Sequence, residues 1–204
     1  MNDTNLEPWK LQESKYIIND RWLKVKSNTY KTPTGHTIDP YYVIESDDWI
    51  NCFVIDGLEV IMVNHYRPAA DVYLPELVSG GIEPTDASPQ DAMRRELEEE
   101  IGYTGGELHQ TGVSYANPAR QNNKIYSFIA FGGRCDLVQR LEDGESLQIM
   151  RMPFKELLEM LEDKSTVHQS THLAAIFFAL NFLRESASSE LQELKTVLEG
   201  FYAR

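Results

Sequence analysis

The first part of the chain alternates apolar and polar positions in the manner of β-strands. Residues 15–32 are rich in Tyr, Ile, Val and Trp, and a Pro-Thr-Gly turn at 33–35 ends this stretch. Further strands are predicted at residues 41–45, 50–55, 60–63 and 124–131. Asp56-Gly57 falls between two of these strands and is a dipeptide typical of β-hairpins.

Helical spacing of apolar residues begins later in the chain. The pattern predicts helices at residues 89–101, 154–161, 173–183 and 191–201. The first helix has clear boundaries, with Ser88 as its N-cap, Pro89 as its first residue and Gly102 as its stop. The order of strands, helix, strands and helices predicts a mixed sheet with helices packed on it, and not a regular βαβ series.

The chain divides into an N-terminal strand region, residues 1–50, and a main domain, residues 51–204. The short N-terminal region carries many apolar strand residues, including Trp9, Tyr16, Ile17, Ile18, Trp22 and Leu23. A free sheet of this kind would expose its edges and an apolar face. We therefore expect a homodimer in which this region packs on the partner subunit or is exchanged with it.

Composition narrows the possible functions. The chain has 204 residues, 42% of them hydrophobic, and a formal net charge of -13, which disfavours binding to nucleic acid or anionic lipid. No apolar run is long enough to span a bilayer, and the N-terminus lacks the pattern of a signal peptide, so the cytoplasm is the predicted compartment. Cys52 and Cys135 suggest neither a disulfide framework nor a zinc cluster.

The helix at residues 89–101 is strongly acidic. On a helical wheel its apolar stripe consists of Met93, Leu97 and Ile101. Glu96 and Glu100 lie one turn apart at the edge of this stripe, Glu99 lies just beyond them, and Glu98 points away. Neighbouring carboxylates repel one another, and a divalent cation would relieve the repulsion. A solvated acidic helix face is the alternative interpretation.

A glycine-rich turn, SGGIEPTD at residues 79–86, leads from a strand into this helix. Such turns let the backbone approach phosphates, and their carbonyl groups can also ligate a cation. Arg95 is placed to pair with Glu99 one turn later. Together, the turn, the helix and the carboxylates indicate metal-assisted attack on a phosphate.

Residues 95–103, RELEEEIGY, resemble the second half of the Nudix box, GX5EX7REUXEEXGU, in which U is a bulky apolar residue. The first half departs from the box. With Gly81 at the motif glycine, Ala87 occupies the position of the motif glutamate. With Gly80 there instead, Asp86 takes that position after one extra residue. The second alignment is preferred because SGGIEPTD is then similar to the AGLIEPGE of ADP-ribose pyrophosphatase-like members.

The resemblance extends to the segment before the box. The sequence HYRP at 65–68, followed by PEL at 75–77, is similar to the QYR…ELPAG approach of the nucleoside-diphosphate-sugar branch. Members of that branch typically dimerise through their N-terminal region. The resemblance implies an α/β (α+β) fold of the Nudix type, with a mixed sheet sandwiched between helices and an added N-terminal antiparallel sheet.

The resemblance also implies roles for single residues. A site for Mg²⁺ or Mn²⁺ would use the side chains of Glu96, Glu99 and Glu100 and the backbone carbonyl of Ser79. The substrate would contact Arg67, Glu76 and Arg120, for which the alternatives are an ordinary ion pair or a plain turn. Catalysis would use Glu99 and a general base at Glu145 or, as second choice, Glu142. Trp9, Trp22 and Trp49 stay equal candidates for stacking on the base.

The implied reaction is metal-dependent hydrolysis of the diphosphate bond in ADP-ribose or another nucleoside-diphosphate sugar. Its products would be a nucleoside monophosphate and a sugar phosphate. Two alternatives remain at this stage. One is a different Nudix pyrophosphohydrolase, acting on a dinucleoside polyphosphate or on coenzyme A. The other is a Nudix-like nucleotide-binding module without catalysis, which only the altered first half of the box supports.

Overall fold

The computed structural model describes residues 7–141 and 146–203. The chain divides into two compact units. The first combines residues 1–47 with 115–124, and the second combines residues 48–114 with 125–204.

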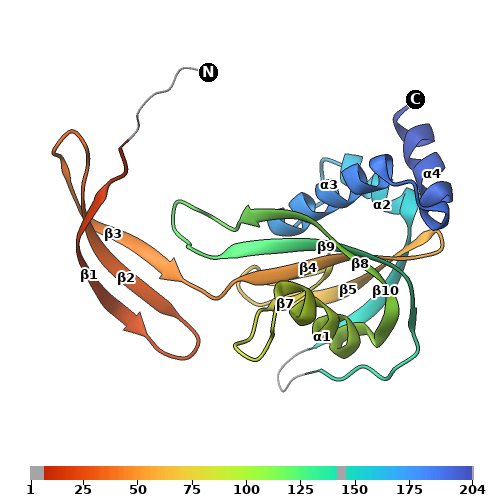
Figure 1. Ribbon diagram of the computed structural model, residues 1–204, viewed down its shortest axis with the longest axis horizontal. Coiled ribbons are helices and arrows are strands. Elements are labelled where there is room, and N and C mark those ends of the chain that lie inside the picture. The colour runs from red at the N-terminus through yellow and green to blue at the C-terminus, as the bar shows by residue number, and fades with distance from the viewer. Residues whose placement is uncertain (1–6, 142–145, 204) are drawn as a thin grey trace. The chain divides into compact units, whose positions relative to one another are not determined.

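The first unit is built on a three-stranded antiparallel sheet, as predicted. Its strands are β1 (Lys10–Asn19), β2 (Lys24–Lys31) and β3 (Thr37–Glu45), with β2 in the centre (Figure 1). The strand-rich stretch at 15–32 therefore forms parts of two strands. The turn between them is held by Asp20, whose carboxylate accepts hydrogen bonds from the N–H groups of Trp22 and Leu23, both at 2.8 Å.

Residues 115–124 belong to the first unit, although the sequence analysis grouped them with the main domain. Hydrogen bonds join this segment to β3. The Ile44 N–H donates to the Arg120 carbonyl at 2.7 Å, and the Tyr41 hydroxyl donates to the Ala119 carbonyl at 2.6 Å. Such long-range backbone pairing leaves no periodic signal in a single sequence.

The second unit contains a mixed sheet, which in the described residues has seven strands. The order is β10-β5-β4-β9-β8, with β6 paired to β5 and β7 paired to β4. The strands are β4 (Trp49–Asp56), β5 (Glu59–Arg67), β6 (Val72–Glu76), β7 (Val78–Gly81), β8 (Tyr103–Tyr115), β9 (Lys124–Cys135) and β10 (Leu147–Pro153). The β4–β9 pair is parallel and the β4–β5 pair is antiparallel, which confirms the predicted mixed sheet.

The strands β4 and β5 separate soon after their hairpin. In the described register they pair at Val54–Asp56 with Glu59–Ile61. Farther from the hairpin, β7 pairs with β4 along Trp49–Cys52, and β6 pairs with β5 along Val63–Arg67. The short strands β6 and β7 therefore fill the space between the two diverging strands.

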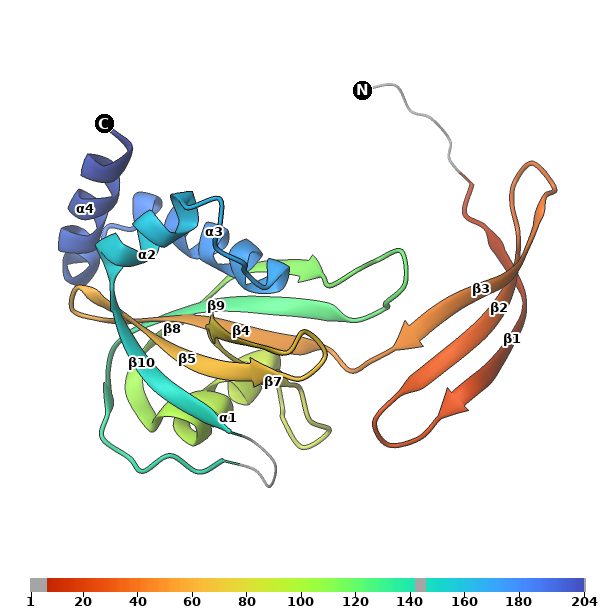
Figure 2. The ribbon, with the colours of Figure 1, turned by 180° about the vertical axis from the view of Figure 1, so that it is seen from behind.

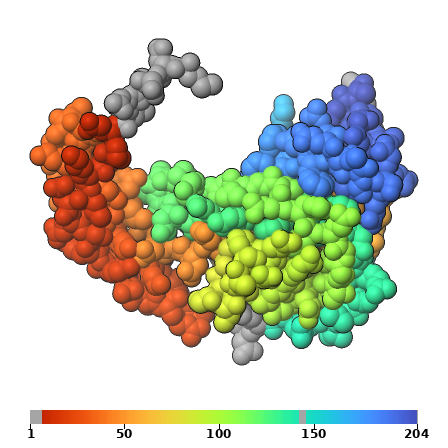
Figure 3. Space-filling view, in the orientation of Figure 1, coloured from red at the N-terminus to blue at the C-terminus, as the bar shows by residue number. Residues whose placement is uncertain are grey.

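Helices cover both faces of this sheet. The helix α1 (Pro89–Ile101) lies on one face, and α2 (Phe154–Glu162), α3 (Ser170–Glu185) and α4 (Gln192–Tyr202) lie on the other, with the short η1 (Ser189–Leu191) before α4 (Figures 1 and 2). The space-filling view shows residues 170–202 packed directly on the strands beneath them (Figure 3). No helix in the described residues is both long enough and apolar enough to cross a membrane.

Side chains of β4 alternate between the two cores. Cys52 and Val54 belong to the cluster that includes α1, whereas Phe53 and Ile55 pack with the helices of the other face. The predicted stripe of α1 is also in place, since Met93, Leu97 and Ile101 are all buried. The predicted sandwich of helices, sheet and helices is therefore confirmed.

The boundaries predicted for α1 are also confirmed. The Ser88 hydroxyl accepts from the Asp91 N–H at 3.1 Å and donates to the Asp91 carboxylate at 2.7 Å, so Ser88 is the N-cap of the first turn. At the other end Gly102 has φ = 64°, a left-handed conformation. A Cβ at this position would lie 2.1 Å from the Leu137 carbonyl oxygen.

We expect Gly102→Ala to destabilise the fold by about 3 kcal/mol, since it combines a left-handed backbone with a clash against main chain. Gly57→Ala is the matched control. Gly57 has φ = 60°, and nothing lies within 4 Å of the added Cβ, so the expected loss is about 1 kcal/mol. Chemical unfolding of both variants measures the difference. Equal losses would contradict a role for Gly102 beyond its backbone angle.

Candidate functional site

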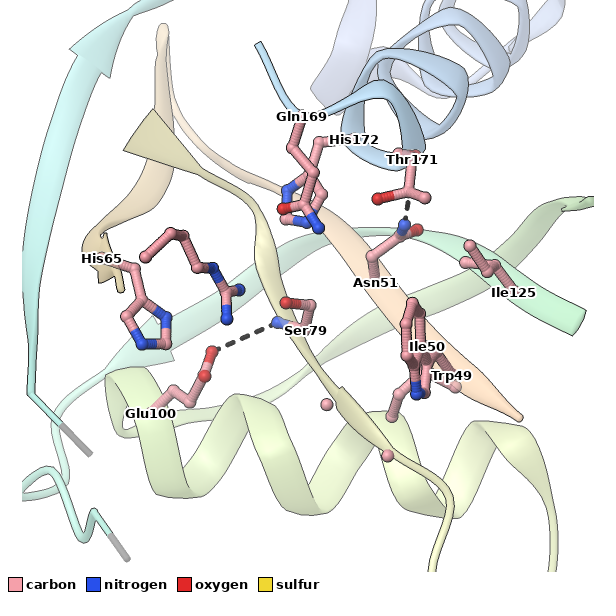
Figure 4. Close-up of a pocket in the computed structure, with 13 residues that line it drawn as sticks. Trp49, Ile50, Asn51, His65, Ser79, Glu100, Ile125, Gln169, Thr171 and His172 are labelled. Carbon is pink, nitrogen blue, oxygen red and sulfur yellow. Dashed lines mark hydrogen bonds between the residues drawn. The ribbon is translucent and has the colours of Figure 1, made fainter. Parts of the chain in front are cut away.

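A pocket of about 280 Å³ opens in the second unit (Figure 4). It lies where β6 and β7 separate β4 from β5. One side is bordered by His65 and Arg67 of β5, Glu100 of α1 and the backbone of residues 79–81. The other side is bordered by Asn51 of β4 and by three residues at the start of α3, which are Gln169, Thr171 and His172.

Two glutamates of α1 lie against the backbone of β7. The Glu100 carboxylate accepts a hydrogen bond from the Ser79 N–H at 3.2 Å, and Glu100 is only 5% exposed. The Glu96 carboxylate rests on Gly80, where an added Cβ would lie 2.0 Å from Glu96 Oε1. A glycine at position 80 is therefore needed for Glu96 to approach the backbone this closely.

Arg95 gathers carboxylates from the loop and the helix. Its guanidinium donates to Asp86 at 3.1 Å, to Glu96 at 2.9 Å and to Glu99 at 3.0 Å. The predicted Arg95–Glu99 pair is thus confirmed, and these carboxylates raise the pKa of Arg95. Glu98 is exposed, as expected, and pairs with Arg140.

Asp86 ties the loop before α1 to the helix. Its carboxylate accepts from Arg95 and also from the Glu83 N–H at 2.8 Å. The guanidinium beside it lowers the pKa of Asp86 below its ordinary value of 3.8. The neighbouring Ala87 is exposed. In the structure, the carboxylate that orders this loop is therefore that of Asp86.

Arg67 and Glu76, both predicted as substrate contacts, bind each other. Arg67 Nε donates to Glu76 Oε1 at 2.8 Å, and Arg67 Nη2 donates to Glu76 Oε2 at 2.5 Å. Glu76 is 1% exposed, whereas the Arg67 side chain is 38% exposed and borders the pocket. The bond to Glu76 raises the pKa of Arg67. The ion pair fixes the orientation of Arg67 and leaves it at the pocket wall.

The donor set suits a hard divalent cation. Glu96 and Glu100 supply carboxylates beside Ser79 and Gly80, where backbone carbonyls are further oxygen donors. Nowhere in the described ranges do three or more His, Cys, Asp or Glu side chains form a ready-made metal cluster. Glu99, which pairs with Arg95, is 35% exposed in its side chain. Glu96 and Glu100 are thus the residues that would hold a cation.

The remaining candidates are Arg120, the three tryptophans and the two glutamates proposed as general base. Arg120 lies in the first unit, where its guanidinium stands 5.4 Å from the centre of the Tyr41 ring. Of the three tryptophans, Trp49 borders the site pocket, while Trp9 and Trp22 belong to the first unit. Glu142 and Glu145, the candidates for the general base, lie outside the described residues, so their role stays a prediction.

Sequence reasoning missed the second wall of the pocket. The sequence analysis assigned no role to Asn51, Gln169, Thr171 or His172, nor to His65 on the first side. A signal existed for Asn51, because it is an amide inside the otherwise apolar strand WINCFVI. The residues at the start of α3 carry no comparable signal, since polar residues are common at helix N-termini.

Comparisons with known proteins identify the family of the chain. The NUDIX domain model matches residues 48–173, and the model of the nucleoside diphosphate sugar hydrolase N-terminal domain matches residues 9–44. The chain is 30% identical to an ADP-sugar pyrophosphatase of Mus musculus over 78% of this chain and 81% of that protein. It is 25% identical to an ADP-ribose pyrophosphatase of Bacillus subtilis over 62% of this chain and 69% of that protein.

The fold also has a close counterpart among solved structures. The crystal structure of an ADP compounds hydrolase superposes with a TM-score of 0.77 at 20% sequence identity, covering 88% of this chain and 96% of that one. At this identity the likeness concerns the fold. The match to the domain model covers more than half of the chain and includes the acidic helix α1. The chain therefore belongs to the Nudix family and is a Nudix hydrolase.

Proposed function

We propose that this enzyme hydrolyses the diphosphate bond of a nucleoside diphosphate linked to a sugar, such as ADP-ribose. The products are a nucleoside monophosphate and a sugar phosphate. The proposal depends on one observation: the same pocket is lined by Arg67, Glu100 and the glycine backbone of β7. A guanidinium and a glycine backbone suit phosphate oxygens, and a carboxylate beside them suits a bridging cation.

Each group has a separate task in this proposal. Arg67, held by Glu76, orients the diphosphate through its guanidinium fork. Glu96 and Glu100 would hold Mg²⁺ or Mn²⁺, with Glu99 and the Ser79 carbonyl as further predicted ligands. When bound, the metal would supply charge neutralisation and a lowered pKa for the attacking water. Glu145 or Glu142 remains the predicted general base.

The substrate class is supported by the comparisons. The N-terminal match is to a domain of nucleoside diphosphate sugar hydrolases, and the two curated relatives are named for ADP-ribose and ADP-sugars. A dinucleoside polyphosphate or coenzyme A has no comparable support. The proposal therefore favours a sugar as the second half of the substrate.

The first test is a substrate panel with Mg²⁺ or Mn²⁺, run on the wild type and on Glu100→Gln. We expect the wild type to convert ADP-ribose to AMP and ribose 5-phosphate, as measured by chromatography. Glu100→Gln should lower turnover by roughly a hundredfold or more, because a ligand charge is lost at the pocket.

Glu98→Gln is the matched control on the same helix, since Glu98 is exposed and pairs with Arg140. It should keep activity close to that of the wild type. Thermal unfolding must show that both variants are folded. Near-normal turnover by Glu100→Gln would refute the cation-binding role of this helix.

Asp86→Ala should weaken activity, because it frees both the loop and Arg95. It should also lower stability at neutral pH. Since Arg95 lowers the pKa of Asp86, this contribution is fully present above the unfolded pKa and is lost as the pH falls through the lowered folded pKa. Metal titration and unfolding between pH 2 and 7 measure both effects, with Glu98→Gln as control. An unchanged metal dependence would refute the alignment that places Asp86 at the first acidic position.

We also propose that the enzyme is a homodimer that uses the first unit. Along its whole length β1 is exposed, and several large apolar side chains of this unit are uncovered. They include Trp9, Leu11, Tyr16, Ile17, Ile18, Trp22 and Leu23. A short sheet with so much exposed apolar surface needs a covering partner, and an isologous contact between two copies supplies one.

Light scattering at micromolar concentration should give the mass of a dimer. Ile17→Glu places a charge on the exposed apolar surface and should shift the protein toward the monomer. Leu58→Glu is the control, because Leu58 is similarly exposed but lies on the hairpin of the second unit. A monomeric wild type would contradict the proposal.

A further inference from the structure

His172 presents a hydrogen-bond donor at the pocket. The Leu77 N–H donates to His172 Nδ1 at 2.8 Å, so this nitrogen carries no proton. A neutral imidazole then has its proton on Nε2. Burial acts in the same direction, because it lowers the pKa of His172 to about 4. The Nε2–H group therefore needs an acceptor.

The Gln169 amide cannot form favourable hydrogen bonds with His172 and with the Glu76 carboxylate at the same time. One terminal atom of its amide lies 2.9 Å from His172 Nε2 and 3.1 and 3.2 Å from the two oxygens of Glu76. If that atom is the carbonyl oxygen, it accepts from His172 but faces a carboxylate. If it is the amide nitrogen, it donates to Glu76 but faces the Nε2–H group. Each orientation therefore leaves either two acceptors or two donors facing each other.

The Glu76 carboxylate is also held by Arg67, which donates two hydrogen bonds to it. A hydroxyl group can accept from His172 and donate to Glu76 at the same time, which an amide end cannot do. Gln169 is able to give way, because it is half-buried and its side chain does not cap α3.

Asn51 supplies a second unmet group on the same wall. It is 2% exposed, and its Nδ2 donates to the Thr171 carbonyl at 3.4 Å. Its Oδ1 is buried and has no hydrogen-bond partner in the described part of the chain. A buried acceptor without a donor is costly and uncommon. Figure 4 shows Asn51, Thr171 and Gln169 across Ser79 from Glu100 and His65.

We propose that Asn51 and His172, with Gln169 as the side chain that the ligand displaces, form a hydroxyl subsite that binds a sugar of the substrate beside its diphosphate. The proposal rests on the proposed function and names the feature that selects the sugar. A further phosphate at this wall would face the Glu76 carboxylate and be repelled, whereas a hydroxyl satisfies each unmet group. The hydroxyl can belong to the terminal sugar or to the ribose of the nucleoside, and the test separates these sources.

The test compares ADP-ribose with two analogues, one lacking a hydroxyl on the terminal ribose and one lacking the 2′-hydroxyl of the adenosine. We expect the wild type to prefer ADP-ribose over one analogue by roughly tenfold in kcat/KM, as for one or two hydrogen bonds. The disfavoured analogue identifies which sugar the subsite holds. Asn51→Leu should reduce this preference to less than about threefold.

Stability distinguishes this role from a structural one. Because Asn51→Leu removes a buried unpartnered acceptor, it should melt at the same temperature as the wild type or higher, while losing discrimination. Asn181→Leu, at a half-buried position farther along α3, is the matched control and should keep the preference. If Asn51→Leu retains the full preference for ADP-ribose over both analogues, the subsite is refuted.

Gln169→Ala provides a second variant at a position that tolerates change. Removing the amide should raise kcat/KM for ADP-ribose but not for the disfavoured analogue, because the hydroxyl no longer competes with it. An unchanged ratio would count against the subsite. Failure of the wild type to hydrolyse any nucleoside-diphosphate sugar would instead refute the proposed function itself, so the two failures are distinguishable.

Discussion

The buried carboxylate of Glu76 is the constraint on which the site depends. A charge that is 1% exposed needs charged or polar partners. Arg67 meets it with a fork of two hydrogen bonds from the neighbouring strand β5. Because β6 is inserted where β4 and β5 diverge, this pair lies at the pocket and not at a sheet edge. The Glu76 carboxylate also lies within hydrogen-bond distance of Gln169, so it is the negative group nearest to a ligand on that wall.

The side of the pocket that Arg67 borders also depends on close backbone approach. Gly80 allows Glu96 to rest on β7, and the Ser79 N–H binds Glu100. Arg95 pairs with Asp86 and Glu99 in the same region, so its guanidinium holds carboxylates of the loop and the helix together. The carboxylates of α1 that lie near the loop are thus balanced by Arg95 and by the Ser79 N–H group, and Glu96 and Glu100 lie beside the backbone of β7.

The sequence predicted those parts of the structure that depend on local pattern. The capped helix α1, its buried stripe and its Arg95–Glu99 pair follow from spacing along one helix. The pocket wall of Asn51, Gln169 and His172 could not be predicted this way. It joins β4 to the start of α3, more than a hundred residues later, and depends on side-chain packing across the sheet. The proton position on His172 likewise follows only from its contact with Leu77.

The two walls of the pocket make different chemical demands. The wall of Arg67, Glu100 and residues 79–81 offers charges and backbone groups that suit a diphosphate and a cation. The wall of Asn51 and His172 offers neutral groups: a buried acceptor without a partner, and a donor whose neighbour Gln169 also faces the Glu76 carboxylate. An anion would satisfy only the first wall, and an apolar group would satisfy neither. A molecule that joins a diphosphate to a hydroxyl-bearing ring meets both demands together, so selectivity arises from polar groups that the folded chain leaves unmatched.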